Sequence, residues 1–304
     1  MKWRGRRQSD NIEDRRGTTV ARGPGMRMPA GTTVRRAGGG GLVTLVVIGL
    51  VLWAVAGINP LQLISILGGD GAPVETGWQR APADRAPAPG ADDEMKQFVA
   101  TVLAETEDTW GRLFAENGGR YGEPTLVLFT GSVRSACGFA GAAAGPFYCP
   151  GDSRVYLDLA FFQELARRFG APGDFAQAYV IAHEVGHHVQ NELGILPEAN
   201  RLRQRLDEVA SNRVSVQIEL QADCFAGIWA HYADRDGLLD ADDVSEALAA
   251  ARAVGDDTLQ RRMQGYVVPE TFSHGTSEQR QRWFMTGLRS GDVTDCDTFN
   301  ARAL

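Results

Sequence analysis

The feature that most constrains this chain is an uncharged apolar run, Leu42–Ile58 (LVTLVVIGLVLWAVAGI). A helix needs about 17–25 such residues to cross a bilayer, and Leu61–Leu67 could extend the run. Residues 1–40 hold ten Lys/Arg and three Asp/Glu. The positive-inside rule therefore predicts a single-pass anchor in the cytoplasmic membrane, with the N-terminus cytoplasmic and the rest of the chain extracytoplasmic. A cleaved signal peptide ending near Ala54-Val55-Ala56 is the alternative, although about 40 residues is long for its n-region.

This run divides the chain into four parts. Residues 1–40 are rich in Arg and Gly, and we expect a basic, disordered cytoplasmic tail. Residues 41–67 form the expected transmembrane anchor, and residues 68–93 form a linker dominated by Gly, Ala, Pro and Asp. Residues 94–304 form one domain of ordinary size. The chain after residue 40 holds 21 basic and 35 acidic residues, which argues against a nucleic acid partner because phosphates would be repelled.

Periodicity within the domain predicts an α+β fold that is mostly helical with a small sheet. Short strands are expected at 125–130 and 153–159, with a long loop at 131–153 between them. The alternation in Ser153–Leu159 (SRVYLDL) indicates a half-exposed strand, and an edge strand here could bind an extended polypeptide. The expected helices cover residues 94–117, 160–169, 175–193, 197–233, about 240–255, and a last segment starting at 276 or 277.

The segment His183-Glu184-Val185-Gly186-His187 lies inside one of these expected helices. Residues four apart share a helix face, so both imidazoles can bind one metal ion. Glu184 lies beside them and can accept a proton from a metal-bound water that attacks a carbonyl. A pair of exposed helix histidines is the alternative, but the chain has only five His and this helix is amphipathic.

A third ligand is expected on the next long helix. Glu219 and Asp223 are four apart on a largely apolar helix, so inward-facing carboxylates there would need partners. We expect Glu219 to complete a site for one Zn²⁺ per chain, and Asp223 to accept a hydrogen bond from a ligand histidine. Two rivals exist: His188, which points about 100° away around the helix, and His231, which could share a face with Asp223.

The remaining histidine, His274, precedes the last expected helix. An N–H donor near the metal would stabilise the oxyanion formed during amide hydrolysis, and His274 is the candidate. The alternative is a capping loop in which Thr276 or Ser277 is the N-cap and His274 is merely buried. Arg280 could pair with a carboxylate near the site, such as Asp223.

Four cysteines follow the apolar run, on the expected exported side where disulfides persist. Three pairings are possible. Nearness in sequence favours Cys137–Cys149 and Cys224–Cys296, and four free thiols are the alternative.

Several segments together resemble the bacterial putative neutral zinc metallopeptidase family. The resemblance implies a zincin-like domain that hydrolyses peptide bonds by zinc-activated water, with polypeptides as substrates, in a bacterial membrane. It is similar in logic to the gluzincins, where two helix histidines and a downstream glutamate hold zinc and an aspartate follows four residues later. The His274 segment is similar to a downstream His segment of membrane-bound CAAX-type and heat-shock metallopeptidases, although those carry Pro where this chain has Gly275. The segments are Cys137-Gly138, Gly145–Pro150, Val155–Asp158, His183–Gln190, Glu219–Cys224 and His274–Ser277.

We therefore expect a membrane-anchored zinc metalloendopeptidase with Glu184 as general base. One alternative is a non-catalytic, membrane-tethered binding or scaffold protein that contains zinc, but a purely structural site has no use for Glu184. Another is a redox or assembly factor that works through its cysteines, which lacks the support of a C-x-x-C motif.

Overall fold

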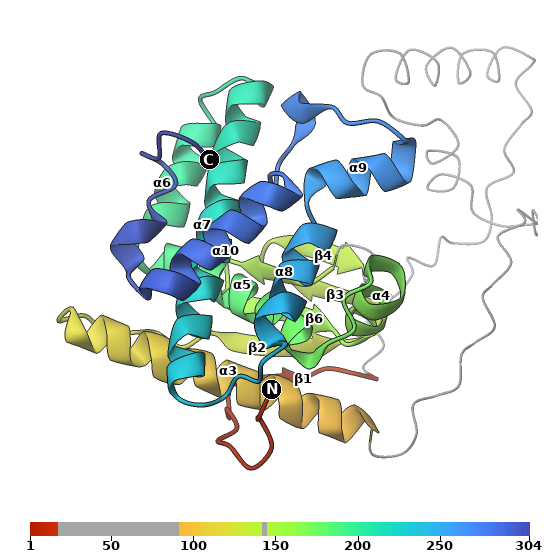
Figure 1. Ribbon diagram of the computed structural model, residues 1–304, viewed down its shortest axis with the longest axis vertical. Helices are drawn as coiled ribbons and strands as arrows, with labels where there is room; N and C mark the ends of the chain where they lie inside the picture. Colours follow the sequence, from red (N-terminus) through yellow and green to blue (C-terminus); the bar gives the residue numbers. More distant parts are fainter. Residues whose placement is uncertain (18–90, 142–144) are drawn as a thin grey trace, which may run out of the picture. The chain divides into compact units, whose positions relative to one another are not determined.

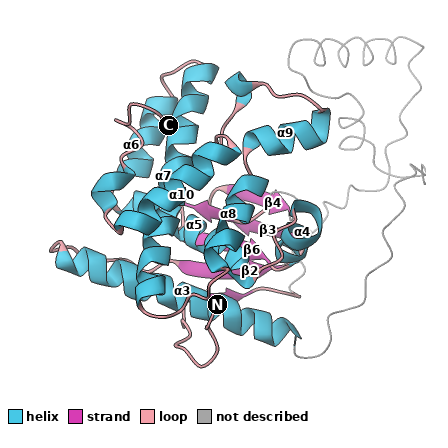
Figure 2. Cartoon of the chain, viewed as in Figure 1, coloured by secondary structure: helices cyan, strands magenta, loops and turns pink. Residues whose placement is uncertain are grey.

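The computed structural model describes residues 1–17, 91–141 and 145–304. The expected anchor, Leu42–Ile58, and nearly all of the expected linker lie outside these residues. Within the described ranges, no helix is both long enough and apolar enough to cross a bilayer. Residues 1–17 and the chain from residue 91 onward fall in one compact unit, which is mostly helical with a small sheet, as expected (Figures 1 and 2).

The sheet has four strands in the order β1-β2-β6-β5. Strands β1, β2 and β6 are parallel, and β5 pairs with β6 in the antiparallel direction. A separate hairpin, β3–β4, lies in the stretch that we expected to be a loop. The strands are β1 (Ile12–Asp14), β2 (Thr125–Phe129), β3 (Ser132–Ser135), β4 (Gly138–Gly141), β5 (Phe147–Cys149) and β6 (Arg154–Asp158).

Both faces of the central strands are buried. Leu126 and Leu128 of β2 belong to the main core, which they share with the helices. Val127 and Phe129 belong to a smaller core with Val133 of the hairpin. Since successive side chains of a strand point to opposite faces, β2 needs apolar residues throughout. The half-exposure expected for the strand at 153–159 is therefore wrong: β6 is a buried interior strand, and β1 and β5 are the edges of this sheet.

The helices closely follow the expected periodicity, except that one expected helix is divided in two and one helix, α9, was not expected. The segment 197–233 divides into α6 and α7, and Asp207 caps α7 by accepting a hydrogen bond from the Ala210 N–H. Residues after 240 form α8 and α9. Thr276 caps α10 in a capping box with Gln279, as one alternative expected. The helices are α3 (Ala91–Glu116), α4 (Ala160–Phe169), α5 (Asp174–Glu192), α6 (Ile195–Arg203), α7 (Glu208–Arg235), α8 (Asp243–Ala253), α9 (Asp256–Gln264) and α10 (Ser277–Ser290).

Two helix crossings depend on glycine. A Cβ atom at Gly186 of α5 would lie 2.9 Å from the carbonyl oxygen of Ala222 in α7. A Cβ atom at Gly287 of α10 would overlap the carbonyl oxygen of Cys224 in α7. Because glycine carries no side chain, these backbones can approach closely. Helix α7 is therefore held between α5 and α10.

The first 17 residues, here called the N-terminal segment, are folded. Strand β1 pairs with β2, and the Trp3 indole packs in the main core against Phe98 of α3, with ring centroids 5.4 Å apart. The disorder expected for residues 1–40 is thus wrong for residues 1–17, and the rest of that range lies outside the described residues. The basic residues fit the acidic side of α3, in the pairs Arg4–Glu94, Arg6–Glu105, Arg7–Glu107 and Arg7–Asp108.

This sheet limits how the chain can be arranged about a membrane. Paired strands lie about 4.8 Å apart, whereas a bilayer core is about 30 Å thick. Strands β1 and β2 must therefore lie on the same side of any membrane. The expected single-pass arrangement, with the N-terminus on one side and the domain on the other, is incompatible with this pairing.

Both favoured disulfides are confirmed. Cys137–Cys149 joins the turn of the β3–β4 hairpin to β5. Cys224–Cys296 joins α7 to the 3-10 turn Val293–Cys296 near the C-terminus. The described residues contain no free cysteine, so the four free thiols of the alternative are not present.

Candidate active site

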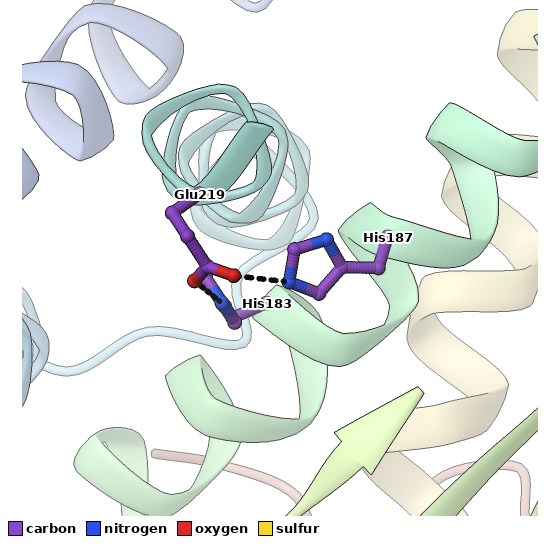
Figure 3. A group of neighbouring side chains, drawn as sticks. All are labelled: His183, His187 and Glu219. Atoms are coloured by element: carbon purple, nitrogen blue, oxygen red, sulfur yellow. Dashed lines mark ion pairs between the residues drawn. The ribbon is translucent and has the colours of Figure 1, made fainter. Parts of the chain in front are cut away.

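Helices α5 and α7 bring His183, His187 and Glu219 together. The Nε2 atom of His183 lies 3.2 Å from Oε2 of Glu219, and Nε2 of His187 lies 3.5 Å from Oε1 of the same carboxylate. One ligand atom from each residue lies within 4.8 Å of the other two, so one ion could contact all three (Figure 3). The spacing of four places the two imidazoles on one face of α5, and Gly186 between them allows α7 to approach with Glu219.

His183 is oriented by a buried ion pair. Its Nδ1 atom lies 2.9 Å from Oδ1 of Asp223, and Asp223 also accepts hydrogen bonds from the Tyr179 hydroxyl and the Arg280 guanidinium, at 2.7 Å from Nε and 2.9 Å from Nη2. The expected Arg280–Asp223 pair is therefore present. The buried carboxylate is neutralised by one arginine, and it can hold the imidazole in one orientation.

Electrostatics within this cluster favour a cation between the ligands. Burial acts to lower the pKa of His183, but the carboxylates of Asp223 and Glu219 outweigh it and raise this pKa to about 10. Burial acts to raise the pKa of Glu219, but the imidazoles of His187 and His183 lower it well below its ordinary value. The two carboxylates attract positive charge, which either a proton or a metal ion can supply.

His187 has a different partner, one that sequence reasoning missed. Its Nδ1 atom lies 2.9 Å from Oε1 of Gln190, one turn further along α5. Gln190 is fully buried. The only sequence signal was a glutamine three residues after a candidate ligand, where helical geometry places the two side chains side by side.

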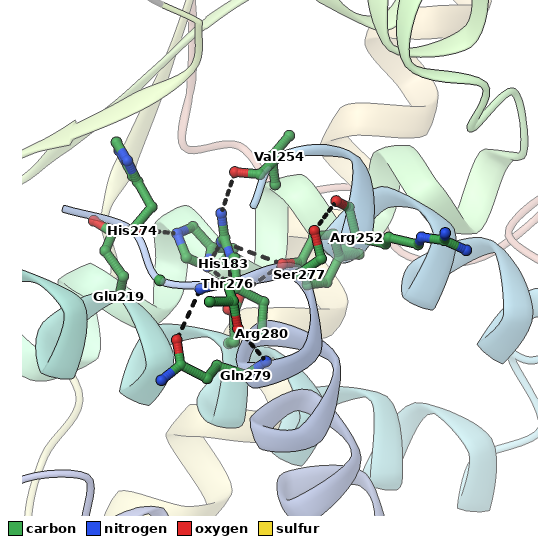
Figure 4. Close-up of polar contacts among 12 residues, drawn as sticks. His183, Glu219, Arg252, Val254, His274, Thr276, Ser277, Gln279 and Arg280 are labelled. Carbon is green, nitrogen blue, oxygen red and sulfur yellow. Dashed lines mark hydrogen bonds and ion pairs between the residues drawn. The ribbon is translucent and has the colours of Figure 1, made fainter. Parts of the chain in front are cut away.

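His274 lies on the loop before α10, near His183 and Glu219 (Figure 4), and it lines the same cavity as the three ligands. Its Nδ1 atom lies 3.1 Å from Oδ1 of Asp256, at the start of α9. The other oxygen of Asp256 accepts the backbone N–H groups of Ser273, His274 and Gly275. Asp256 raises the pKa of His274. Burial acts to raise the pKa of Asp256, but hydrogen bonds from His274 outweigh it and lower this pKa. Sequence reasoning missed Asp256, because only the folded chain brings it to His274.

A cavity of ≈460 Å³ opens beside these groups. Glu184, His274 and the three clustered ligands line it. Its walls also include apolar side chains from α4, α5 and α9, namely Phe161, Val180 and Leu259. The cavity therefore combines a carboxylate, an imidazole and an apolar surface around one candidate metal centre.

The two rival histidines lie elsewhere. The ring nitrogens of His188 contact the Tyr148 hydroxyl and the Gly122 carbonyl oxygen. The Nδ1 atom of His231 lies 2.9 Å from the Leu288 carbonyl oxygen. Neither belongs to a metal-compatible cluster among the described residues, so both contribute to packing.

The donor set fits zinc. The Nδ1 atoms of His183 and His187 are both occupied by oxygen acceptors, which leaves the Nε2 atoms to face Glu219. Two imidazole nitrogens, each supported by a further hydrogen bond, and one carboxylate are a common ligand set of catalytic zinc.

Comparisons with known proteins show the family of the chain. A family model described as a putative neutral zinc metallopeptidase matches residues 1–299. The chain is 47% identical over 302 residues to the uncharacterized protein YpfJ of Escherichia coli (strain K12), covering 98% of this chain and 99% of that protein. It is 43% identical over 226 residues to the uncharacterized protein Rv2575 of Mycobacterium tuberculosis, covering 71% and 75%. No solved structure matched. The chain therefore belongs to the putative neutral zinc metallopeptidase family.

Proposed function

We propose that this protein is a zinc-dependent endopeptidase that hydrolyses peptide bonds in polypeptides. One observation carries the proposal: His183, His187 and Glu219 converge on one point at the wall of a cavity that Glu184 also lines. A purely structural zinc site closes its fourth position with another protein ligand. In the described residues, the cluster offers three ligands and faces a cavity, which favours catalysis over the scaffold alternative.

The roles follow from the contacts. His183, His187 and Glu219 would hold the zinc, which when bound lowers the pKa of water and polarises a carbonyl group. Glu184 accepts the proton of the attacking water and passes it to the departing amine. His274, whose pKa Asp256 raises, donates a hydrogen bond to the developing oxyanion. Asp223 and Gln190 orient the two ligand imidazoles.

The substrate would bind as an added strand on β5. Within the described residues β5 pairs only with β6, and Phe147 and Tyr148 of β5 line the cavity. An extended polypeptide could pair with the free edge of β5 and pass in front of Glu184. The apolar wall formed by Phe161, Val180 and Leu259 suits a bulky apolar side chain next to the cleaved bond. We also propose a zincin-like fold, because the helix that carries the two histidines, α5, lies beside an antiparallel edge strand, β5.

We also propose that the domain is extracytoplasmic and held at the cytoplasmic membrane by Leu42–Ile58, which would enter the bilayer from that side without crossing it as a single span. Two disulfides support an oxidising compartment. Because the N-terminal segment belongs to the domain, it would lie on that same side. Its basic residues, which the positive-inside rule treats as a cytoplasmic signal, instead pair with acidic residues of α3.

The proposal is tested by zinc content and peptidase activity of the purified full-length protein. Residues 94–304 alone would lack β1 and Trp3, so the whole chain is needed. We expect one zinc per chain in wild type and in Glu184→Gln, and its loss in Glu219→Ala. Removing the general base should lower the cleavage of unfolded casein about 10²–10⁴-fold. Glu192→Gln, an exposed glutamate at the end of α5, is the matched control.

Zinc-bound wild type that cleaves neither unfolded protein nor peptides would support the scaffold alternative. Absence of zinc from wild type, or its retention in Glu219→Ala, would refute the assigned ligands.

A further inference from the structure

Building on the proposed zinc site, we infer that Gln190 is a positioning residue that keeps the proton of His187 on Nδ1. A relay of two amides, from Gln190 through Gln221 to the backbone carbonyl of Cys296, sets the direction of this hydrogen bond. His187 would then always present an unprotonated Nε2 to the metal.

The direction follows from what each group can donate. A backbone carbonyl oxygen only accepts hydrogen bonds, so the nitrogen of Gln190 must face the Ile218 carbonyl oxygen, which lies 2.8 Å away. The oxygen of Gln190 then faces Nδ1 of His187, at 2.9 Å. An amide oxygen has no proton, so Nδ1 must donate. The tautomer of His187 is therefore decided by the surrounding hydrogen bonds.

The orientation of the second amide, that of Gln221, is fixed in the same way. Gln190 also donates through Nε2 to Oε1 of Gln221, at 3.0 Å. Gln221 donates through Nε2 to the carbonyl oxygen of Cys296, at 3.0 Å. That carbonyl can only accept, so Gln221 cannot reverse its amide without losing both bonds. The Cys224–Cys296 disulfide joins the carbonyl's residue to α7, the helix that carries Gln221 itself.

Burial of both glutamine side chains disfavours any other orientation of their amides. Gln190 and Gln221 are 0% and 5% exposed, so water cannot readily replace a lost partner. An unpaired buried polar group costs about 1–3 kcal/mol, which disfavours a reversed amide. The two ligand histidines are thus oriented by different means: a charged carboxylate for His183 and a neutral amide for His187. The neutral amide sets the tautomer without adding a third negative charge near Glu219.

Two substitutions at Gln190 separate positioning from packing. Gln190→Met keeps the size but removes the acceptor for Nδ1, and we expect zinc affinity to fall about 10–100-fold. Gln190→Glu keeps an acceptor, so zinc affinity should stay close to that of wild type, although the metal-free protein should melt at a lower temperature. A packing role predicts the opposite order, because a buried apolar side chain is tolerated better than a buried carboxylate.

The measurement is the zinc dissociation constant of full-length protein by chelator competition, with the melting temperature of the metal-free form as a check on folding. Gln217→Met is the matched control. Gln217 also lies on α7 and donates to a C-terminal carbonyl, that of Thr298, but it does not contact His187. If the Met variant does not fold, Gln221→Met tests the next step of the relay and should weaken zinc binding by a smaller factor.

Equal zinc affinity in wild type and Gln190→Met would overturn this inference while leaving the proposed function intact. Equal weakening by Met and Glu would also overturn it, because retention of an acceptor would then make no difference. Wild type that binds no zinc would instead refute the proposed function itself.

Discussion

The metal centre and the N-terminal segment both contact α5, the first through His183 and His187 and the second through Asp174, yet they are encoded in opposite ways. At the centre, two ligands and the proposed base lie within five residues, and helical spacing alone brings them together. In the N-terminal segment, Arg4, Arg6 and Arg7 find partners 90 to 101 residues away on α3. The spacing of the metal ligands can be recognised in a short stretch of sequence. The ion pairs of the N-terminal segment form only after α3 has folded, and the sequence of this segment alone resembles a disordered basic tail.

The two regions are also physically linked. The α-ammonium group of Met1 lies 3.0 Å from Asp174, the first residue of α5, and 3.3 Å from Asp243 at the start of α8. The helix that carries His183 and His187 is thus contacted at its first residue by the N-terminal segment. This comparison leads us to expect that the segment contributes to the stability of the catalytic helix, although it supplies no ligand.

The largest expected effect concerns the side of the membrane on which the two regions lie, because a cysteine is either labelled or not labelled. If β1 belongs to the sheet in the cell, the N-terminal segment and the domain lie on one side of the membrane. Gln8→Cys and Glu116→Cys place single thiols at exposed positions in each part. We expect an impermeant thiol reagent to label both variants equally in intact cells whose outer layers are permeabilised. Labelling of only one would show that the two parts are separated, and labelling of neither would contradict the extracytoplasmic location.

The next largest effect concerns stability. Trp3→Ala removes a buried aromatic side chain and should reduce the free energy of unfolding by about 3–5 kcal/mol. Denaturant unfolding of full-length protein measures this, with Gln8→Ala as an exposed control in the same segment. Unchanged stability would mean that the N-terminal segment is an accessory and not part of the core.

The smallest effect is a shift in pH dependence at the metal centre. Asp256 raises the pKa of His274, so Asp256→Asn should lower it. If protonated His274 serves the reaction, activity is lost as pH rises through this pKa, and the loss should begin at lower pH in the variant. The amide oxygen of the introduced asparagine would still accept backbone N–H groups, so the loop should persist. A pH–rate profile whose alkaline limb does not move would remove His274 from the reaction.

Elements that depend on interactions between residues close in sequence were predicted best. Helices α3, α4, α5 and α10 were predicted within a few residues, because their periodicity and caps are local. The strand β6 was placed correctly but was expected to be half-exposed, since no local pattern indicates which strands lie beside it. The short strands β3, β4 and β5 were missed because each has only three or four residues.

Some hydrogen-bond partners of the site histidines were predicted from the sequence, and others were missed. Asp223 was predicted from its spacing to Glu219, and Arg280 was suggested as its partner. Asp256 was missed because it precedes His274 by 18 residues, a stretch that contains helix α9 and the irregular chain after it. Gln190 was missed because an uncharged side chain gives no sign of a role until its hydrogen bonds are known.

From the linear order of residues alone came the helical fold class, the disulfide pairs and the set His183, Glu184, His187, Glu219 and Asp223. The helices and the site residues were predicted from spacing along a helix and from the ligands that a metal ion requires. The disulfide pairs were predicted from nearness in sequence. The folded chain added the position of the N-terminal segment, the order of the strands in the sheet, and the hydrogen bonds that orient His187 and His274. Those depend on complementary surfaces from distant parts of the chain, whose contacts form only when the whole core is packed.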